Sequence, residues 1–176
     1  MKILLNPREA GGDWLVQCDF DGTISKVDVT DTLLERFGKS GWRELEQAWD
    51  DGKIGSRECM MGQVALLDMS PAELHSHLAG IGIDESFYGF VMDARKRGIS
   101  VQVVSDGLDV AIRTVLARSG LEWLPVMANR LVHLGDRRWR MESPHASPHC
   151  KRASGNCKCE RLAEHRPPQG RVLYVG

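Results

Sequence analysis

Short apolar runs alternate along the chain with stretches of helical periodicity. Residues 14–18 form a mostly apolar run that stops at an acidic turn containing Gly22. Residues 99–104 form a second, β-branched run that stops at Ser105, and residues 171–176 form a third. Brief apolar runs of this kind, bounded by turn residues, are typical of buried strands. The pattern therefore predicts three buried strands that lie far apart in the sequence.

The segment between the first two runs, residues 28–97, shows helical spacing of its apolar side chains. Ser70, Pro71 and Glu73 form a typical helix start, with serine at the N-cap, proline at the first helical position and glutamate closing a capping box. We expect roughly four successive helices here and no strand.

The remaining segments complete an alternating pattern. After the second strand we expect a helix that ends at Gly120, then a β-hairpin within residues 124–141 that turns at Gly135 and Asp136. A loop rich in Pro, Ser and His follows, and a short helix near residues 157–165 precedes the last strand.

This order of elements predicts an α/β fold. It indicates a Rossmann-like, mostly parallel sheet, with a helical cap inserted after the first strand and a small β-hairpin. We expect residues 14–24 and 98–176 to form the core domain, residues 25–97 to form the cap domain, and residues 1–13 to form a leader.

Composition narrows the class of protein. The 176 residues fit one domain, or one domain with a modest insert. The formal net charge of −1 gives no overall attraction to nucleic acid or to a membrane surface, and no apolar run approaches the roughly 18 residues of a membrane-spanning helix. Five cysteines, three of them crowded between positions 150 and 159, argue against an extracellular disulfide framework. We therefore expect a cytoplasmic protein that binds neither nucleic acid nor membrane.

Two carboxylates follow the first strand. Asp19 and Asp21 stand two positions apart, so both can lean toward the crevice at the carboxyl end of the strand, where open α/β sheets bind ligands. An ionised aspartate is a ready nucleophile, and a neighbouring acid can protonate a leaving oxygen and later deprotonate water. Gly22 permits a sharp turn whose N–H can face an anion. An acidic turn with a purely structural role is the alternative interpretation.

Two further segments could bind a phosphate group. Ser105, Asp106 and Gly107 lie between a strand and a helix, where a hydroxyl and main-chain N–H groups can bind phosphate oxygens, although this tripeptide is also a common turn. A carboxylate that attacks phosphate needs cations nearby, because like charges repel by about 4 kcal/mol per close pair at an effective dielectric constant of about 20. Lys158 and Lys151 are the candidates, and we favour Lys158 because a tight turn precedes its helix. A solvated surface lysine is the alternative.

The segment from Asp19 to Thr23 resembles the first motif of the haloacid dehalogenase-like phosphatases. The resemblance implies that Asp19 is the nucleophile that forms an aspartyl-phosphate and that Asp21 is the general acid and base. It also implies that both help to hold Mg²⁺, Asp19 through its side chain and Asp21 through its main-chain carbonyl. Gly22 and Thr23 belong to the same motif and are expected to contact the phosphate of the substrate.

The other motifs point to a subgroup of that family. Ser105 to Gly107 resembles the second motif, and Lys158 stands where the third-motif lysine is expected. The subgroup carries a helical cap and includes phosphoserine phosphatase and 2-hydroxy-3-keto-5-methylthiopentenyl-1-phosphate phosphatase, and the Ser-Asp-Gly and Cys-Lys sequences lean toward the latter. The resemblance implies a Mg²⁺-dependent hydrolase of a small phosphomonoester metabolite. The identity of the metabolite and the assembly state, a homodimer included, stay open.

The fourth motif of the family is missing. In the family an acidic turn follows the last strand directly and completes the Mg²⁺ site, whereas this chain stops at Gly176. We therefore expect a fragment truncated before that motif, with weakened metal binding and turnover. A catalytically impaired phosphate-binding or interaction module of the same fold is the alternative.

Two residue clusters suggest other functions. Arginines around a tryptophan in the hairpin are a combination that nucleic-acid binders use, although the net charge opposes that interpretation. Histidines and cysteines before and within the last helix could form a zinc site, but a loop of reduced thiols is favoured because the two-residue spacer of ordinary zinc knuckles is absent. The first cluster comprises Arg137, Arg138, Trp139 and Arg140, and the second comprises His145, His149, Cys150, Cys157 and Cys159.

Overall fold

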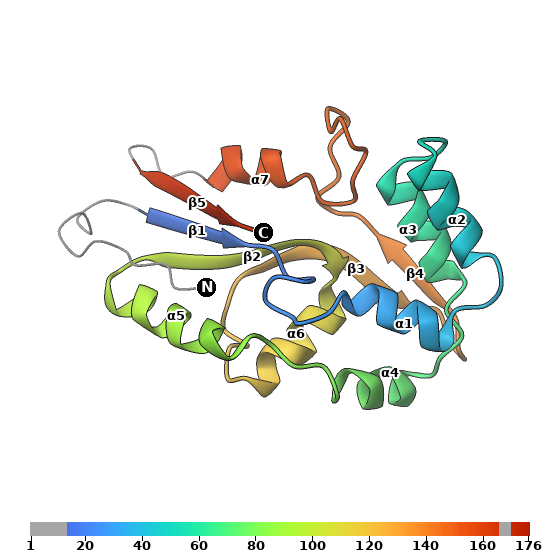
Figure 1. The fold of residues 1–176 in the computed structure, drawn as a ribbon, viewed down its shortest axis with the longest axis horizontal. Helices are drawn as coiled ribbons and strands as arrows, with labels where there is room; N and C mark the ends of the chain where they lie inside the picture. The colour runs from blue at the N-terminus through green and yellow to red at the C-terminus, as the bar shows by residue number, and fades with distance from the viewer. Residues whose placement is uncertain (1–13, 166–169) are drawn as a thin grey trace.

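The strands predicted from the apolar runs lie side by side in one sheet. The structure, a computed structural model, describes residues 14–165 and 170–176, so the expected leader lies outside the described residues. The strands are β1 (Trp14–Cys18), β2 (Ser100–Leu108), β3 (Val126–His133), β4 (Trp139–Glu142) and β5 (Arg171–Val175). Their order across the sheet is β4-β3-β2-β1-β5 (Figure 1).

The sheet is mostly parallel, as the sequence predicts. β1 pairs in parallel with β2 and β5, β2 pairs in parallel with β3, and only the β3–β4 pair among the described strands is antiparallel. Val16, in the middle of β1, lies opposite Val101 of β2 and Leu173 of β5. Parallel strands whose two faces are both covered are built from nearly continuous apolar runs, which explains the sequences of β1 and β2.

Two strands differ from the prediction. β2 continues past Ser105 to Leu108, and its pairing with β3 shifts register between Val104 and Leu108, so the Ser-Asp-Gly segment is an irregular strand end rather than a turn after the strand. The prediction of a buried last strand is wrong, because the side chains of β5 are half-buried or exposed. β5 is an edge strand of the sheet that the described residues form, so only one of its sides is paired.

Five described helices, rather than roughly four, lie between β1 and β2. They are α1 (Val29–Phe37), α2 (Trp42–Asp50), α3 (Ser56–Ala65), α4 (Pro71–Leu78) and α5 (Glu85–Lys96). The next helix, α6 (Asp109–Arg118), follows β2, and the last, α7 (Lys158–His165), precedes β5. None of the described helices is long and apolar enough to cross a lipid bilayer.

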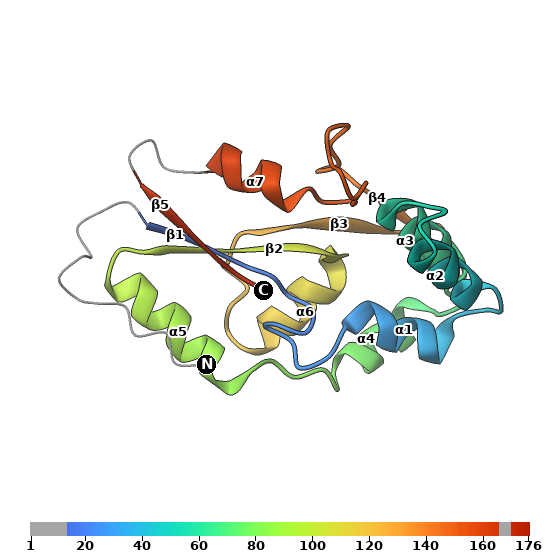
Figure 2. The same cartoon turned by 45° about the horizontal axis from the view of Figure 1, so that its top comes forward.

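The helices divide between the two faces of the sheet. In Figures 1 and 2, α1, α4, α5 and α6 lie on one face and α7 lies on the other. The pair α2 and α3 lies beyond one end of the sheet, where α3 packs against β4 (Figure 1). The segment predicted as a cap therefore contributes three helices to the layer beside the sheet and two helices at its end.

One hydrophobic core joins the sheet to the larger helical layer. Val16 and Val103 of the strands belong to the same buried cluster as Leu33 of α1, Leu74 of α4 and Val91 of α5. Burial of each such side chain stabilises the fold by about 1.5–3 kcal/mol relative to leaving it exposed. The division of the chain into a core domain and a cap domain stays a prediction.

The predicted hairpin is present. β3 and β4 pair from His133 opposite Trp139 to Arg130 opposite Glu142. Gly135 in the turn has a φ of 97°, which favours glycine, and Asp136 has a φ of 51° in the small left-handed region that aspartate tolerates. The turn sequence therefore explains where the chain reverses.

Arg137 and Trp139 of the hairpin form hydrogen bonds with other parts of the protein. Arg137 donates hydrogen bonds to the carboxylates of Asp68 (2.5 Å) and Glu73 (2.6 Å). The buried indole of Trp139 donates to the carbonyl oxygen of Met69 (2.8 Å). These contacts hold the hairpin against the start of α4, which gives Arg137 and Trp139 a structural role.

The capping box of α4 gives a prediction about stability. The Ser70 hydroxyl accepts the Glu73 N–H (3.2 Å), and the Glu73 carboxylate accepts the Ser70 N–H (2.8 Å). We expect Ser70→Ala to lower the free energy of unfolding by about 1 kcal/mol, because one N–H of the first turn loses its acceptor. Urea unfolding measures this, with Ser76→Ala, an exposed position inside the same helix, as the matched control. Equal stability of the two variants would contradict the prediction.

Candidate active site

The turn after β1 presents two aspartates at the edge of the sheet. The Asp19 N–H donates to the Val175 carbonyl of β5 (2.8 Å), which carries the parallel pairing one residue past β1. Phe20 is fully buried, and its carbonyl oxygen accepts the N–H groups of three residues that follow in the turn. Gly22 makes the reversal possible with a φ of 68°. Phe20 is therefore part of the core, whereas Asp19 and Asp21, its neighbours in the chain, are only half-buried at the carboxyl end of β1.

Asp21 is held by hydrogen bonds at both carboxylate oxygens. Oδ1 accepts the N–H of Val29 at the start of α1 (2.9 Å), and Oδ2 accepts the hydroxyl of Ser105 (3.3 Å). Burial, followed by the nearby charge of Asp28, raises the pKa of Asp21 from 3.8 to about 6, and the charge of Asp19 adds to the rise. A carboxyl group with such a pKa can both donate and accept a proton near neutral pH.

The Ser105 segment brings the ends of β1 and β2 together. Ser105 is fully buried, and its hydroxyl accepts the Gly107 N–H (2.9 Å) while donating to Asp21. A Cβ atom at Gly107 would collide with Asp21 Oδ2 and would lie 3.1 Å from the Ser105 oxygen. Only glycine therefore allows the main chain of β2 to approach the Asp21 carboxylate this closely.

Lys158 is the lysine that the fold brings to the aspartates. Its ammonium forms an ion pair with Asp19 Oδ2, and the two side chains are only 29% and 21% exposed. The Tyr174 hydroxyl donates to the same oxygen (3.4 Å). Burial lowers the pKa of Lys158, but hydrogen bonds to Asp19 and Tyr174 outweigh it and raise the pKa above its usual value. Lys151, the other candidate, is exposed in the preceding loop.

The carboxylate of Asp106 is occupied by protein donors. Oδ1 accepts the Asn156 N–H (2.8 Å) and the Asn129 amide (3.1 Å). Oδ2 accepts the hydroxyl of Ser56 at the start of α3 (3.3 Å). Through these hydrogen bonds Asp106 connects β2 to β3, to the loop before α7 and to the start of α3.

The first-motif N–H groups are used within the turn. The Gly22 N–H donates to Val27 (3.4 Å) and the Thr23 N–H donates to Phe20 (3.2 Å). The structure thus brings Asp19, Asp21, Ser105, Gly107 and Lys158 together, while Gly22 and Thr23 shape the turn that carries the aspartates. Their predicted contact with a phosphate group stays a prediction.

A model of a known family covers nearly all of this arrangement. The family described as haloacid dehalogenase-like hydrolase matches residues 16–176, from β1 through β5. The chain belongs to the haloacid dehalogenase-like hydrolase family. The resemblance drawn from the three sequence motifs is therefore confirmed, and so is the hydrolase class of the enzyme.

Curated relatives in this family are phosphatases. The chain is 26% identical over 164 residues to a 2-hydroxy-3-keto-5-methylthiopentenyl-1-phosphate phosphatase of Brevibacillus brevis, an alignment that covers 90% of this chain and 72% of that protein. It is 26% identical over 120 residues to a phosphoserine phosphatase of Methanocaldococcus jannaschii, with 67% and 56% of the two chains covered.

Solved structures of the family share the fold. A structure described as a phospho-aspartyl intermediate analogue of phosphoserine phosphatase superposes with a TM-score of 0.65 at 22% identity, over 87% of this chain and 70% of that chain. Phosphoserine phosphatase from T. onnurineus gives a TM-score of 0.65 at 17% identity, over 97% and 76%. These likenesses confirm the fold class.

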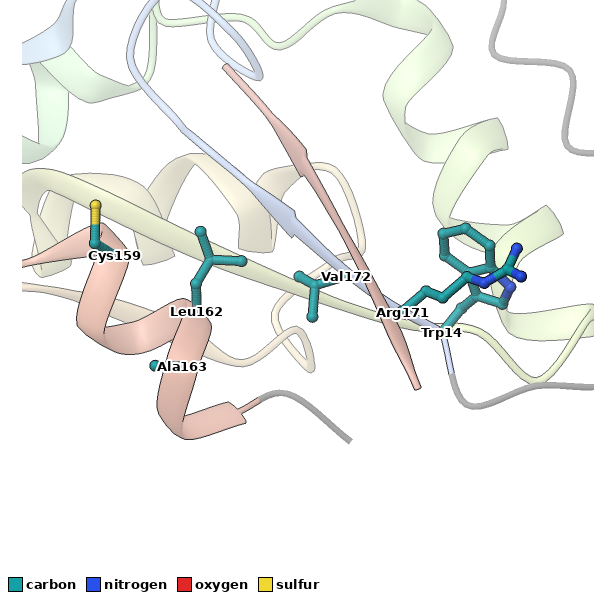
Figure 3. A pocket seen from close by; sticks show the side chains of 6 residues that line it. All are labelled: Trp14, Cys159, Leu162, Ala163, Arg171 and Val172. Carbon is teal, nitrogen blue, oxygen red and sulfur yellow. The ribbon is translucent and has the colours of Figure 1, made fainter. Parts of the chain in front are cut away.

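Neither aspartate lines the pocket described next. It has a volume of about 640 Å³ and lies between α7 and the β1–β5 part of the sheet (Figure 3). The Arg171 guanidinium lies 5.5 Å from the centre of the Trp14 ring at one end of it. Both residues begin their strands, whereas hydrolases of this fold bind ligands at the carboxyl ends. The lining residues are Trp14, Cys159, Leu162, Ala163, Arg171 and Val172.

The cysteine- and histidine-rich loop does not form a metal centre in the described part of the chain. Within residues 14–165 and 170–176, no three His, Cys, Asp or Glu side chains are arranged to hold a metal ion. All five cysteines carry free thiols, and the thiol of Cys150 contacts the Ser154 hydroxyl (3.2 Å). The interpretation of a loop of reduced thiols stays a prediction.

Three residues near the site carry no clear signal in the sequence. Asn129 and Asn156 are completely buried polar residues, and Tyr174 lies within the apolar run of β5. A buried asparagine looks like any loop or strand asparagine until its neighbours are known. Tyr174 reads as an ordinary strand residue, and only the pairing of β5 with β1 brings its hydroxyl to Asp19.

The tight approach at Gly107 gives a prediction about activity. We expect Gly107→Ala to reduce kcat/KM by roughly 100-fold, because the added methyl group displaces the Asp21 carboxylate. Steady-state kinetics with p-nitrophenyl phosphate measures this, and circular dichroism checks the fold. Gly89→Ala, on α5 where a Cβ meets no neighbouring atom, is the matched control. Unchanged kinetics of Gly107→Ala would show that Asp21 tolerates displacement.

Proposed function

We propose that this hydrolase cleaves a small phosphomonoester through an aspartyl-phosphate formed on Asp19. The observation that supports this most is the ion pair between Asp19 and Lys158, beside the protonatable carboxyl of Asp21. A nucleophile, a proton donor and a cation are the three groups that phosphoryl transfer to a carboxylate requires.

The proposed reaction has two steps. The Asp19 carboxylate attacks phosphorus, the bond from phosphorus to the ester oxygen breaks, and Asp21 gives its proton to the leaving oxygen. Asp21 then takes a proton from a water molecule, which attacks the phosphorus of the aspartyl-phosphate. The bond from phosphorus to the Asp19 oxygen breaks, which restores the Asp19 carboxylate and releases inorganic phosphate. Lys158 and the Ser105 segment hold the phosphoryl oxygens, and the ammonium offsets the repulsion between carboxylate and phosphate.

The residues present fit a magnesium ion. Mg²⁺ prefers oxygen ligands, keeps several waters and is commonly held by one or two carboxylates together with the phosphate of the substrate. The Asp19 carboxylate is such a ligand, whereas the Asp21 carboxylate is engaged by Val29 and Ser105, so Asp21 would contribute its main-chain carbonyl. A bound Mg²⁺ would supply positive charge to the transferring phosphoryl group.

The pair α2 and α3 is the part of the predicted cap best placed to select the substrate. Ser56 at the start of α3 donates to Asp106, and the Arg57 N–H donates to Ala153 in the loop before α7 (2.9 Å). We propose that this pair covers the phosphate site and excludes water during turnover.

The name of the Brevibacillus relative makes 2-hydroxy-3-keto-5-methylthiopentenyl-1-phosphate the first substrate to test, and phosphoserine the second. Five free thiols support a reducing compartment such as the cytoplasm.

The nucleophile assignment is tested by Asp19→Asn. We expect kcat/KM to fall by at least roughly a thousandfold with Mg²⁺ present, because the amide cannot form the acyl-phosphate. The thermal midpoint should stay close to that of the parent, since the carboxylate serves chemistry rather than the core. Asp93→Asn, an exposed carboxylate on α5, is the matched control. Turnover that survives in Asp19→Asn would remove Asp19 from the mechanism, whereas phosphate binding by an inactive parent would favour a binding module.

The raised pKa of Asp21 predicts the pH dependence. Below about 6 the carboxyl carries the proton that the leaving oxygen needs, and above about 6 the proton is lost. The rate of Asp19 phosphorylation by an alkyl phosphate should therefore fall as the pH rises through that value. p-Nitrophenolate leaves without a proton, so p-nitrophenyl phosphate should show a much weaker fall. Single-turnover kinetics across the pH range compares the two, and parallel profiles would count against Asp21 as the proton donor.

A further inference from the structure

The loop that leads to Lys158 is fixed to the sheet by the buried side-chain amide of Asn156. The Asn156 side chain is fully buried, and its amide donates to the carbonyl oxygens of Ser105 (2.9 Å) and Met127 (2.8 Å). These carbonyls belong to the later half of β2 and to the start of β3, so one side chain connects two neighbouring strands. The loop itself makes only a short parallel bridge, between Asn156 and His145.

Two further polar residues complete this arrangement. Asp106 accepts the Asn156 main-chain N–H (2.8 Å), and the Asn129 amide donates to both the carbonyl (2.5 Å) and the carboxylate (3.1 Å) of Asp106. Gly155 packs directly against Asn129, because an added Cβ would lie 2.8 Å from the amide nitrogen. We call Asp106, Asn129 and Asn156 the polar cluster.

The polar cluster includes the residue two positions before α7. Lys158 is the first residue of α7 and stands two positions after Asn156. Asn156 is anchored on β2 and β3, whereas the ammonium of Lys158 reaches Asp19, which follows β1. A shift of the loop by about 1 Å is enough to weaken such a contact and can cost roughly 100-fold in rate.

We propose that the polar cluster is a positioning device for Lys158, and that Asp106 serves it through the acceptor capacity of its oxygens rather than through its charge. The proposal rests on the function proposed above for the Asp19 site. Each Asp106 oxygen already has a protein donor, and an ionised carboxylate would repel a phosphate group. In this proposal Asp106 binds neighbouring protein groups and does not contact the substrate, in contrast to the prediction from the sequence.

Two variants of Asp106 separate acceptor capacity from charge. In Asp106→Asn the amide oxygen can accept from Asn129 and Asn156, and its nitrogen can donate to the Ser56 hydroxyl. Asp106→Ala removes the carboxylate oxygen that accepts hydrogen bonds from Asn129 and Asn156. We expect Asp106→Ala to lower kcat/KM for p-nitrophenyl phosphate by roughly 100-fold, and Asp106→Asn to recover most of that loss. Equal losses in the two variants would show that the charge matters, which overturns the proposal.

A second experiment measures how fast the Lys158 ammonium is acetylated and does not depend on enzyme turnover. The full chain is treated briefly with acetic anhydride at one fixed pH, and the acetylation rate of Lys158 is compared by mass spectrometry with that of exposed Lys96. In the parent, pairing with Asp19 should make Lys158 the slower of the two. We expect Lys158 to react several times faster in Asp106→Ala and Asn156→Ala, but not in Asp106→Asn.

The control variant is Ser56→Ala, which removes only the α3 contact to Asp106 and should leave Lys158 slow. Slow acetylation of Lys158 in Asp106→Ala would overturn the positioning role, and this variant decides the matter if Asn156→Ala fails to fold. A parent that cleaves no phosphomonoester would refute the proposed function. The acetylation rates would then still decide whether the polar cluster positions the lysine.

Discussion

The ion pair between Lys158 and Asp19 is the contact on which the candidate site depends. It joins residues 139 positions apart in the chain, one after β1 and one at the start of α7. The pair is partly buried, so salt screens its attraction less than that of a surface pair. Correct placement of β1, β2 and the loop before α7 is therefore a condition for bringing acid and cation together.

The same crowding of charge gives the second aspartate its different character. Asp21 lies close to Asp28 and Asp19, and burial together with these charges raises its pKa. Two carboxylates two residues apart thus have different environments, one paired with an ammonium and one desolvated. A buried carboxyl group with a raised pKa, next to a carboxylate that is paired with a cation, is typical of acid–base sites. The tight turn around the buried Phe20 creates this asymmetry.

Several features of the fold were predictable because they depend on local chemistry. β1 and the capping box of α4 follow from the apolar run and the Ser-Pro-Ala-Glu sequence, and the hairpin follows from Gly135 and Asp136. The sequence underestimates the number of helices between β1 and β2, because α3 lacks a clear apolar stripe: its buried residues are Cys59, Gln63 and Val64. The burial of β5 was misjudged because its apolar sequence does not tell whether a strand has one neighbour or two.

The available chemistry can be read from the amino-acid order: two spaced acids, a serine segment and a lysine, each next to a strand or helix end, in a pattern shared with a hydrolase family. The fold adds which lysine reaches the acids, that Asp106 faces protein donors, and that Asn156 and Tyr174 lie beside the site. The two kinds of information differ because a residue type fixes what a side chain can donate or accept, whereas its partners depend on strand order and loop path. Those arise from packing across the whole chain.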